Sequence, residues 1–178
     1  MRRSAAVLAA ATCALSCYVV STHPIRGESP IQLDPALAGS WRGQDELEAG
    51  DREDVVTFTS HGDHYVLAGD DEDEVYEITT ARLGEHRYLN AIEIGAESSV
   101  YFVFRYRVEG DRLWIAPLDR DAVERHRERG ELAAEKSEPA RPIVLTAGTE
   151  ELERFLLSHD PLELFPEPNS YSVHVGAE

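Results

Sequence analysis

The sequence predicts a mainly β fold with minor α, in which an antiparallel meander closes into a barrel and one or two C-terminal helices pack on it. Three observations lead to this fold class. Short runs rich in β-branched and aromatic residues follow one another from about residue 54, with turn sequences at hairpin spacing between them. The run at 100–108 alternates with a period of two, and helical spacing appears only after residue 118.

The first four runs predict two hairpins. His61-Gly62-Asp63 is a typical turn sequence and divides the first pair, while Gly84-Glu85 divides the second. The four predicted strands are residues 54–60, 64–67, 75–83 and 87–94.

The clearest strand is predicted at 100–108. One of its faces is apolar and the other is mixed, which is typical of a strand with one face in a core and the other partly in water. A Gly-Asp turn then leads into a strand at 112–118. The apolar face consists of Val100, Phe102, Phe104, Tyr106 and Val108.

Two helices are predicted after the meander. The first, at 119–129, is short and highly charged, and a glycine follows it. The second, at 150–159, has Thr149 as its predicted N-cap, glutamates in its first turn and an apolar stripe, and Pro161 ends it. A short strand is predicted between them at 142–146, and the proline-containing tail is predicted to be irregular.

Residues 1–17 are predicted to be a signal peptide of the lipoprotein type. Two arginines precede an apolar segment of eleven residues, which suits a signal peptide because a bilayer span needs about 20 residues. Small residues precede Cys17, as a peptidase requires, and the thiol is the group that is alkylated with a diacylglycerol. Two alternatives stay open: ordinary cleavage near Ser21, and an uncleaved anchor that extends through Val19 and Val20.

The remaining chain is expected to have two parts. Residues 18–36 contain several prolines and little periodicity, so they are predicted to be a flexible tether. Residues 37–178 are predicted to form a single β-rich domain. The two cysteines, Cys13 and Cys17, both lie in the leader, so the domain itself has no thiol for a disulfide, a metal or a nucleophile.

The charge of the chain is strongly unbalanced. There are 17 basic and 34 acidic residues; two of the basic ones lie in the leader, which leaves 15 against 34 and a net charge of −19. Nucleic acids and anionic lipids are bound through clustered lysines and arginines, so the sequence argues against both as partners of a basic face.

Several histidines are weighed as metal ligands. The pair in His61-Gly62-Asp63-His64 is better explained by a hairpin turn than by a metal site. The remaining candidates, His126, His159 and His174, lie separately in charged or irregular contexts, so a site built from them requires the fold to assemble it.

Two charged segments have a functional and a structural interpretation. The acidic run at 70–74 is favoured as a solvated connection, because it lacks the spacing and the glycine of an EF-hand loop. The mixed-charge helix at 119–129 is favoured as a solvated helix over a partner-binding surface. The sequence has no Gly-x-Ser-x-Gly elbow, phosphate loop or dinucleotide fingerprint.

A set of aromatic residues either lines a ligand cavity or fills the barrel. The packed core is favoured, because narrow barrels are filled by their own side chains. The set is Trp41, Phe58, Tyr65, Tyr88, Phe102, Phe104 and Tyr106.

Leu37-Ala38-Gly39-Ser40-Trp41 resembles the opening Gly-x-Trp element of lipocalin-type barrels, and this resemblance implies that Trp41 closes the bottom of the barrel. The stretch from Leu37 to about Tyr171 is similar to a family of small uncharacterised bacterial predicted lipoproteins. That resemblance implies a lipocalin-like β-rich domain and a location in the cell envelope, and it carries no known activity or catalytic residue. The matching segments are residues 37–41, 57–59, 61–65, 87–90, 104–113, 116–119, 144–152 and 155–156.

The expected function is that of an exported, non-enzymatic lipoprotein, attached to the membrane through Cys17 on its extracytoplasmic side. Within that location, a lipocalin-like module that binds an apolar ligand or an envelope partner is expected. The alternatives are a purely structural or interaction lipoprotein with a filled core, and a hydrolase whose site is not visible in sequence. No catalytic residue, cofactor or metal ligand is assigned.

Overall fold

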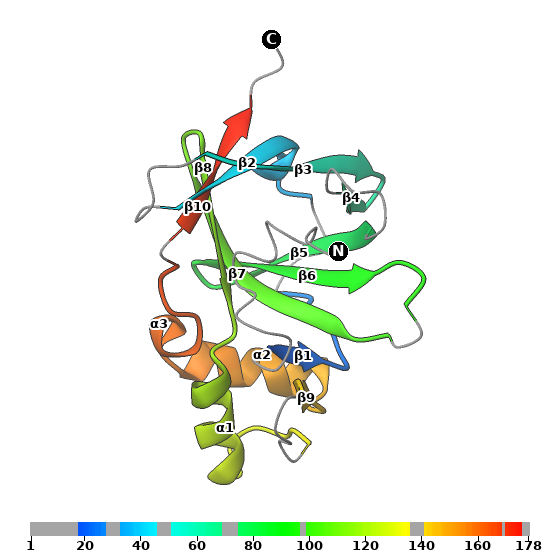
Figure 1. The fold of residues 1–178 in the computed structure, drawn as a ribbon. Coiled ribbons are helices and arrows are strands. Elements are labelled where there is room, and N and C mark those ends of the chain that lie inside the picture. The colour runs from blue at the N-terminus through cyan, green and yellow to red at the C-terminus, as the bar shows by residue number, and fades with distance from the viewer. Residues whose placement is uncertain are drawn as a thin grey trace.

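Eight antiparallel strands form a closed barrel, which confirms the predicted fold class (Figure 1). The structure is a computed structural model that describes residues 18–27, 33–45, 51–68, 75–96, 99–135, 141–168 and 170–175. The barrel closes because β6 pairs with both β5 and β7, while β10 joins β8 to β2. Its strands are β2 (Gly39–Asp45), β3 (Asp51–His61), β4 (His64–Ala68), β5 (Val75–Leu83), β6 (His86–Glu93), β7 (Tyr101–Glu109), β8 (Arg112–Pro117) and β10 (Ser170–Val175).

Three of the hairpins have the tight turns that the sequence predicts. Each turn contains one glycine with a positive φ, a conformation that other residues adopt only with strain. These glycines are Gly62 between β3 and β4, Gly84 between β5 and β6, and Gly110 between β7 and β8.

The prediction of an irregular tail is wrong, because the tail contains β10, which completes the barrel. Tyr171 lies opposite Gln44 of β2, and Ser172 lies opposite Leu113 of β8. Both partners are remote in sequence, and the prolines before the strand hide its alternating pattern.

The helices follow the meander and pack on one side of the barrel (Figure 1). They are α1 (Arg120–Glu128), α2 (Thr149–Ser158) and the short α3 (Pro161–Leu164), and the strand β9 (Ile143–Leu145) lies between α1 and α2. The predicted N-cap of α2 is wrong: Gly148 is the N-cap, and the Thr149 hydroxyl donates to the Pro24 carbonyl at 2.9 Å. Pro161 begins α3, where its fixed φ suits the first turn.

Two cores lie on opposite faces of the barrel wall. Alternate residues of a strand point to opposite sides, so Phe104 of β7 lies in the interior core and Val103 lies in the outer one. The outer core is covered by the apolar faces of the helices. Its helical members are Ala122 and Val123 of α1, Leu152, Phe155 and Leu156 of α2, and Leu164 of α3.

The prediction that residues 18–36 form a flexible tether is wrong for most of this segment. Val19–Ser21 form strand β1, which pairs antiparallel with β7 and parallel with β9. Val19 and Val20 are 5% and 3% exposed, so the strand is part of the core. Its partners lie about 80 and 120 residues away in the chain, which is why local composition does not reveal it.

After β1, the chain runs along the outer side of the barrel, where side chains of β6 and α2 hold its backbone. The buried Asn90 amide of β6 accepts from the Ile25 backbone N–H and donates to the Ile25 carbonyl, both at 2.8 Å. Glu153 of α2 accepts from the backbone N–H groups of Arg26 and Gly27. These bonds fix residues 18–27 between the barrel and α2.

Candidate functional site

The barrel interior contains most of the aromatic residues that the sequence singled out. Five of the seven lie in one buried cluster, Phe102 is partly buried against it, and Tyr88 belongs to the outer core. Large side chains therefore pack against one another in the interior of the barrel. The five are Trp41, Phe58, Tyr65, Phe104 and Tyr106.

Trp41 of β2 follows a short 3-10 helix, η2 (Pro35–Leu37), and is 1% exposed. Its indole N–H donates to the Leu37 carbonyl at 2.9 Å, and Leu37 is itself fully buried in the interior core. The indole thus holds η2 against the interior of the barrel.

Asp34 ties η2 to three barrel strands. Its carboxylate accepts from the Arg87 guanidinium at 2.7 Å and from the Tyr106 hydroxyl at 3.0 Å, and its carbonyl accepts from the Tyr65 hydroxyl at 2.9 Å. Burial, together with the nearby Asp34 carboxylate, raises the pKa of Tyr106 well above its ordinary value. These contacts connect residues of the barrel wall to η2, so we assign the cluster a structural role.

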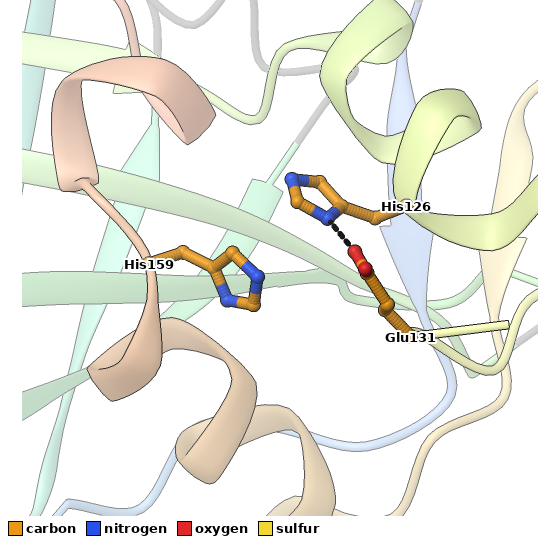
Figure 2. Close-up of side chains that lie close together, drawn as sticks. All are labelled: His126, Glu131 and His159. Carbon is orange, nitrogen blue, oxygen red and sulfur yellow. Dashed lines mark hydrogen bonds and ion pairs between the residues drawn. The ribbon is translucent and has the colours of Figure 1, made fainter. Parts of the chain in front are cut away.

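A second polar cluster lies between the helices and consists of His126, Glu131 and His159 (Figure 2). Each residue offers one nitrogen or oxygen ligand atom, and these atoms all lie within 4.8 Å of one another. Among the described residues this is the group of His, Cys, Asp and Glu side chains that is compact enough to hold a metal ion.

The end of α1 brings Glu131 to His126. Gly130, with φ 72°, turns the chain so that its N–H bonds to the Arg127 carbonyl and the Glu131 N–H bonds to the His126 carbonyl at 3.0 Å. This pair of bonds is the Schellman motif, for which glycine is the usual residue. The Glu131 carboxylate then reaches the His126 Nδ1 at 2.6 Å.

His159 follows the end of α2, and its ring packs against those of His126 and Phe155, with centroid distances of 4.5 and 4.3 Å. Its Nδ1 lies 2.8 Å from the Phe155 carbonyl oxygen and 3.0 Å from the Ser158 hydroxyl. Because Nδ1 is held by its own helix, Nε2 is the nitrogen left to bind a ligand.

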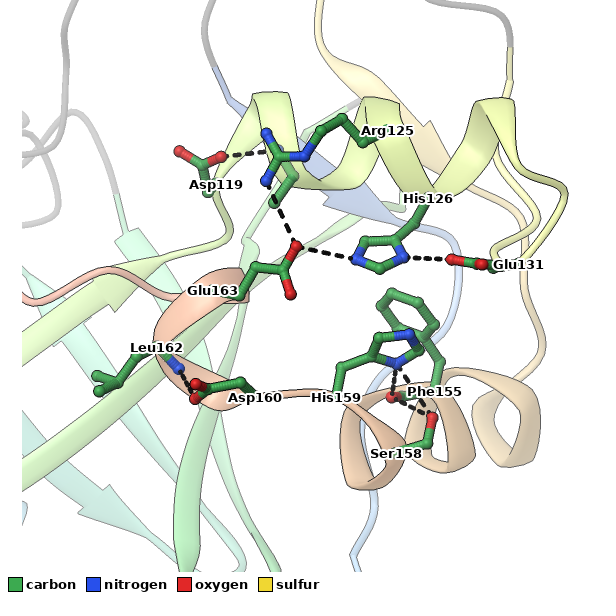
Figure 3. A network of polar contacts seen from close by, with 11 residues as sticks. Asp119, Arg125, His126, Glu131, Phe155, Ser158, His159, Asp160, Leu162 and Glu163 are labelled. Carbon is green, nitrogen blue, oxygen red and sulfur yellow. Dashed lines mark hydrogen bonds and ion pairs between the residues drawn. The ribbon is translucent and has the colours of Figure 1, made fainter.

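The polar surroundings of His126 are asymmetric (Figure 3). Its side chain is 3% exposed, and the Nε2 atom is buried without a hydrogen bond among the described residues. The nearest carboxylate oxygen, Oε1 of Glu163 in α3, lies 3.6 Å away and also faces the Arg125 guanidinium at 3.5 Å. The hydrogen bond from His126 lowers the pKa of Glu131.

The other residues that the sequence analysis weighed lie apart from this cluster. His61 and His64 face each other across the β3–β4 turn with nearly parallel rings, and His64 pairs with Asp63. His174 packs against Trp41. Cys17 and the acidic run at 70–74 lie outside the described residues.

Sequence reasoning considered His126 and His159 only as separate residues. The spacing of His126, Gly130 and Glu131 is a local signal that could have indicated the first pair, because a glycine at the end of a charged helix predicts a Schellman turn. Nothing local connects either residue to His159, which depends on how α1 and α2 pack.

No family model, curated protein or solved structure matches this chain. In the part of the chain that the structure describes, no helix has the length and apolar character needed to cross a membrane.

Proposed function

We propose that this protein is an exported lipoprotein whose β-barrel domain acts as a non-enzymatic binding module on the extracytoplasmic side of a membrane. In this proposal residues 1–17 are the signal peptide and Cys17 carries the lipid. The observation that carries the proposal is the position of β1, which begins at Val19, two residues after Cys17.

The position of β1 bears on the choice between the cleavage sites. Cleavage before Cys17 leaves all of the described residues in the mature protein, whereas cleavage near Ser21 removes the strand that lies between β7 and β9. Burial of a valine side chain contributes about 1.5–3 kcal/mol, so loss of the buried Val19 and Val20 would destabilise the fold substantially. The fold therefore supports processing at Cys17.

The same position implies that the domain sits close to the membrane. One residue, Tyr18, separates Cys17 from β1, and its ring packs on Phe102 at 5.5 Å. Since an extended residue spans about 3.5 Å, the lipidated cysteine would lie within about 10 Å of the sheet. The domain would then have little freedom to move away from the bilayer.

The packing of the barrel favours a partner that binds to its outer surface. Trp41, Phe58 and Tyr65 occupy the interior and are at most 2% exposed. An apolar ligand would have to displace these side chains, whereas an envelope protein could bind to the outside. Between the two kinds of partner considered, we therefore favour an envelope protein.

The proposal is tested by fatty-acid labelling of the full chain in a bacterial host that processes lipoproteins. We expect the wild-type protein and a Cys13→Ser variant to take up the label, and a Cys17→Ser variant to lose it. Cys13→Ser is the matched control, because it removes the other thiol of the leader. Absence of label from the wild-type protein, or loss of label in Cys13→Ser alone, would overturn the proposal.

A further inference from the structure

We infer that His126, Glu131 and His159 bind a divalent transition-metal ion of the zinc type. This site goes beyond the proposed membrane attachment, and it joins the end of α1, the turn that follows it and the end of α2.

The ligand set favours a metal ion that is intermediate between hard and soft. Two imidazoles and one carboxylate suit Zn²⁺, Ni²⁺ and Cu²⁺, whereas Ca²⁺ and Mg²⁺ prefer sites made of oxygens alone. Three protein ligands leave the fourth position of a tetrahedral ion open to water or to a group from a partner.

The three ligand atoms are already nearly as close together as an ion requires. Ligands about 2.1 Å from a shared zinc ion lie about 3.4 Å from one another, and these atoms lie within 4.8 Å. Glu131 is the residue that can move most easily, because its side chain is 43% exposed. The two imidazoles are held by packing against Phe155.

The hydrogen bonds around the two rings match those of metal-binding histidines. Such a ring donates its second N–H to a carboxylate or a backbone carbonyl, which fixes its orientation and tautomer. His159 meets this condition, since its Nδ1 faces the Phe155 carbonyl oxygen at 2.8 Å.

His126 meets the condition in the metal-bound state. A metal ion on Nδ1 takes the place of the proton that faces Glu131, and the ring then carries its proton on Nε2. That N–H would face Glu163, whose Oε1 atom is 3.6 Å away, and a small movement of this 42% exposed side chain would bring the two atoms within hydrogen-bond distance. Metal binding at Nδ1 therefore places a proton on a buried nitrogen that lacks a hydrogen bond among the described residues, and Glu163 is the group that can accept it.

A purely structural histidine–glutamate pair explains less of this arrangement. It accounts for the bond between His126 and Glu131, but a neutral ring that donates its Nδ1–H to Glu131 has no proton on Nε2 to share with Glu163. The buried Nε2 then has no hydrogen bond among the described residues, which costs free energy. The structural pair also gives no reason for His159 to approach the same point with Nδ1 already held. Metal binding accounts for all three features.

The test is calorimetric titration of the purified full chain with ZnCl₂, with Glu131→Gln, His159→Gln and Glu163→Gln as variants. Glu128→Gln is the matched control, because it removes an exposed carboxylate of the same helix outside the cluster. We expect one Zn²⁺ per wild-type chain, and at least about 100-fold weaker binding in Glu131→Gln and His159→Gln. Glu163→Gln should bind about 10- to 100-fold more weakly at unchanged stoichiometry, as loss of such a supporting carboxylate does.

Long-range ¹H–¹⁵N NMR spectra provide a readout that a structural role would not change. On addition of Zn²⁺ to the wild-type protein, His126 should show its proton on Nε2 and a metal-shifted Nδ1. The inference is overturned if the wild-type chain takes up no Zn²⁺, or if the site variants bind it as tightly as Glu128→Gln does. Unchanged affinity in Glu163→Gln, or no change of the His126 tautomer, would overturn the assigned role of Glu163.

Discussion

Gly27 lies against the backbone of β5, in the segment between the barrel and α2. Its φ is 79°, and a Cβ atom at this position would lie 2.6 Å from the Arg82 carbonyl oxygen. The N–H of Gly27 also donates to Glu153 at 2.9 Å. Glycine is required here by conformation and by space together, which shows how closely residues 18–27 are built into the fold.

Gly27→Ala should therefore destabilise the protein more than a matched substitution, Gly62→Ala. Gly62 has a similar φ of 67° but open space around it, so alanine there should cost about 1 kcal/mol from conformation alone. At Gly27 the clash with the Arg82 backbone should add about 2 kcal/mol. Urea unfolding of both variants measures the difference, and equal losses would show that Gly27 is not packed against β5.

Tyr106 should make the fold sensitive to alkali. Burial, followed by the nearby Asp34 carboxylate, raises its pKa in the folded state above the ordinary value of 10.0. Below pH 10 the tyrosine is protonated in both states and stability does not depend on it. Above pH 10 the unfolded chain loses this proton and the native state keeps it, so the free energy of unfolding falls by up to about 1.4 kcal/mol per pH unit.

Unfolding of wild type and Tyr106→Phe between pH 8 and pH 11 checks this. The variant lacks the ionisable group, so its free energy of unfolding should decline less steeply above pH 10. Tyr171→Phe, which removes a hydroxyl outside the interior core, is the control. Parallel curves for wild type and Tyr106→Phe would show that Tyr106 is not held neutral by burial.

At the scale of elements, β1 and β10 differ from the rest of the barrel. The sequence predicts the meander from β3 to β8, because glycine turns mark the ends of these strands. In the structure, successive strands of the meander pair with each other. The three residues of β1 carry no such signal, and the strands with which they pair, β7 and β9, are remote in the sequence. Local pattern therefore predicts hairpins well, and it misses strands that join the sheet from a distance.

Removal of β1 should weaken the whole domain. A chain that starts at Tyr18 retains β1, whereas one that starts at Thr22 loses two valines that are 5% and 3% exposed. We expect the shorter chain to be about 3–6 kcal/mol less stable, because each buried valine contributes about 1.5–3 kcal/mol. Thermal and urea unfolding of the two chains compare them, and equal stability would remove the structural argument for processing at Cys17.

At the scale of the whole molecule, the barrel strands pack against two cores, one inside the barrel and one between the barrel and the helices. The candidate metal site lies beside the outer core. The sequence predicted the barrel, the position of α1 and α2 within about two residues, and a packed interior. It does not predict the site, because the packing of α1 against α2 brings His126 and His159 together. The number of residues between the two helices does not indicate which of their side chains meet. Local patterns of this kind carry information on strands and turns, while the meeting of distant side chains depends on the complete fold.

The attachment of this domain to a membrane is the central claim, and mass spectrometry of the native protein tests it most directly. The account predicts an N-terminal peptide that starts at Cys17 and carries the mass of a diacylglyceryl group, with all later residues retained. An unmodified N-terminus near Thr22, or an intact chain from Met1, would contradict it.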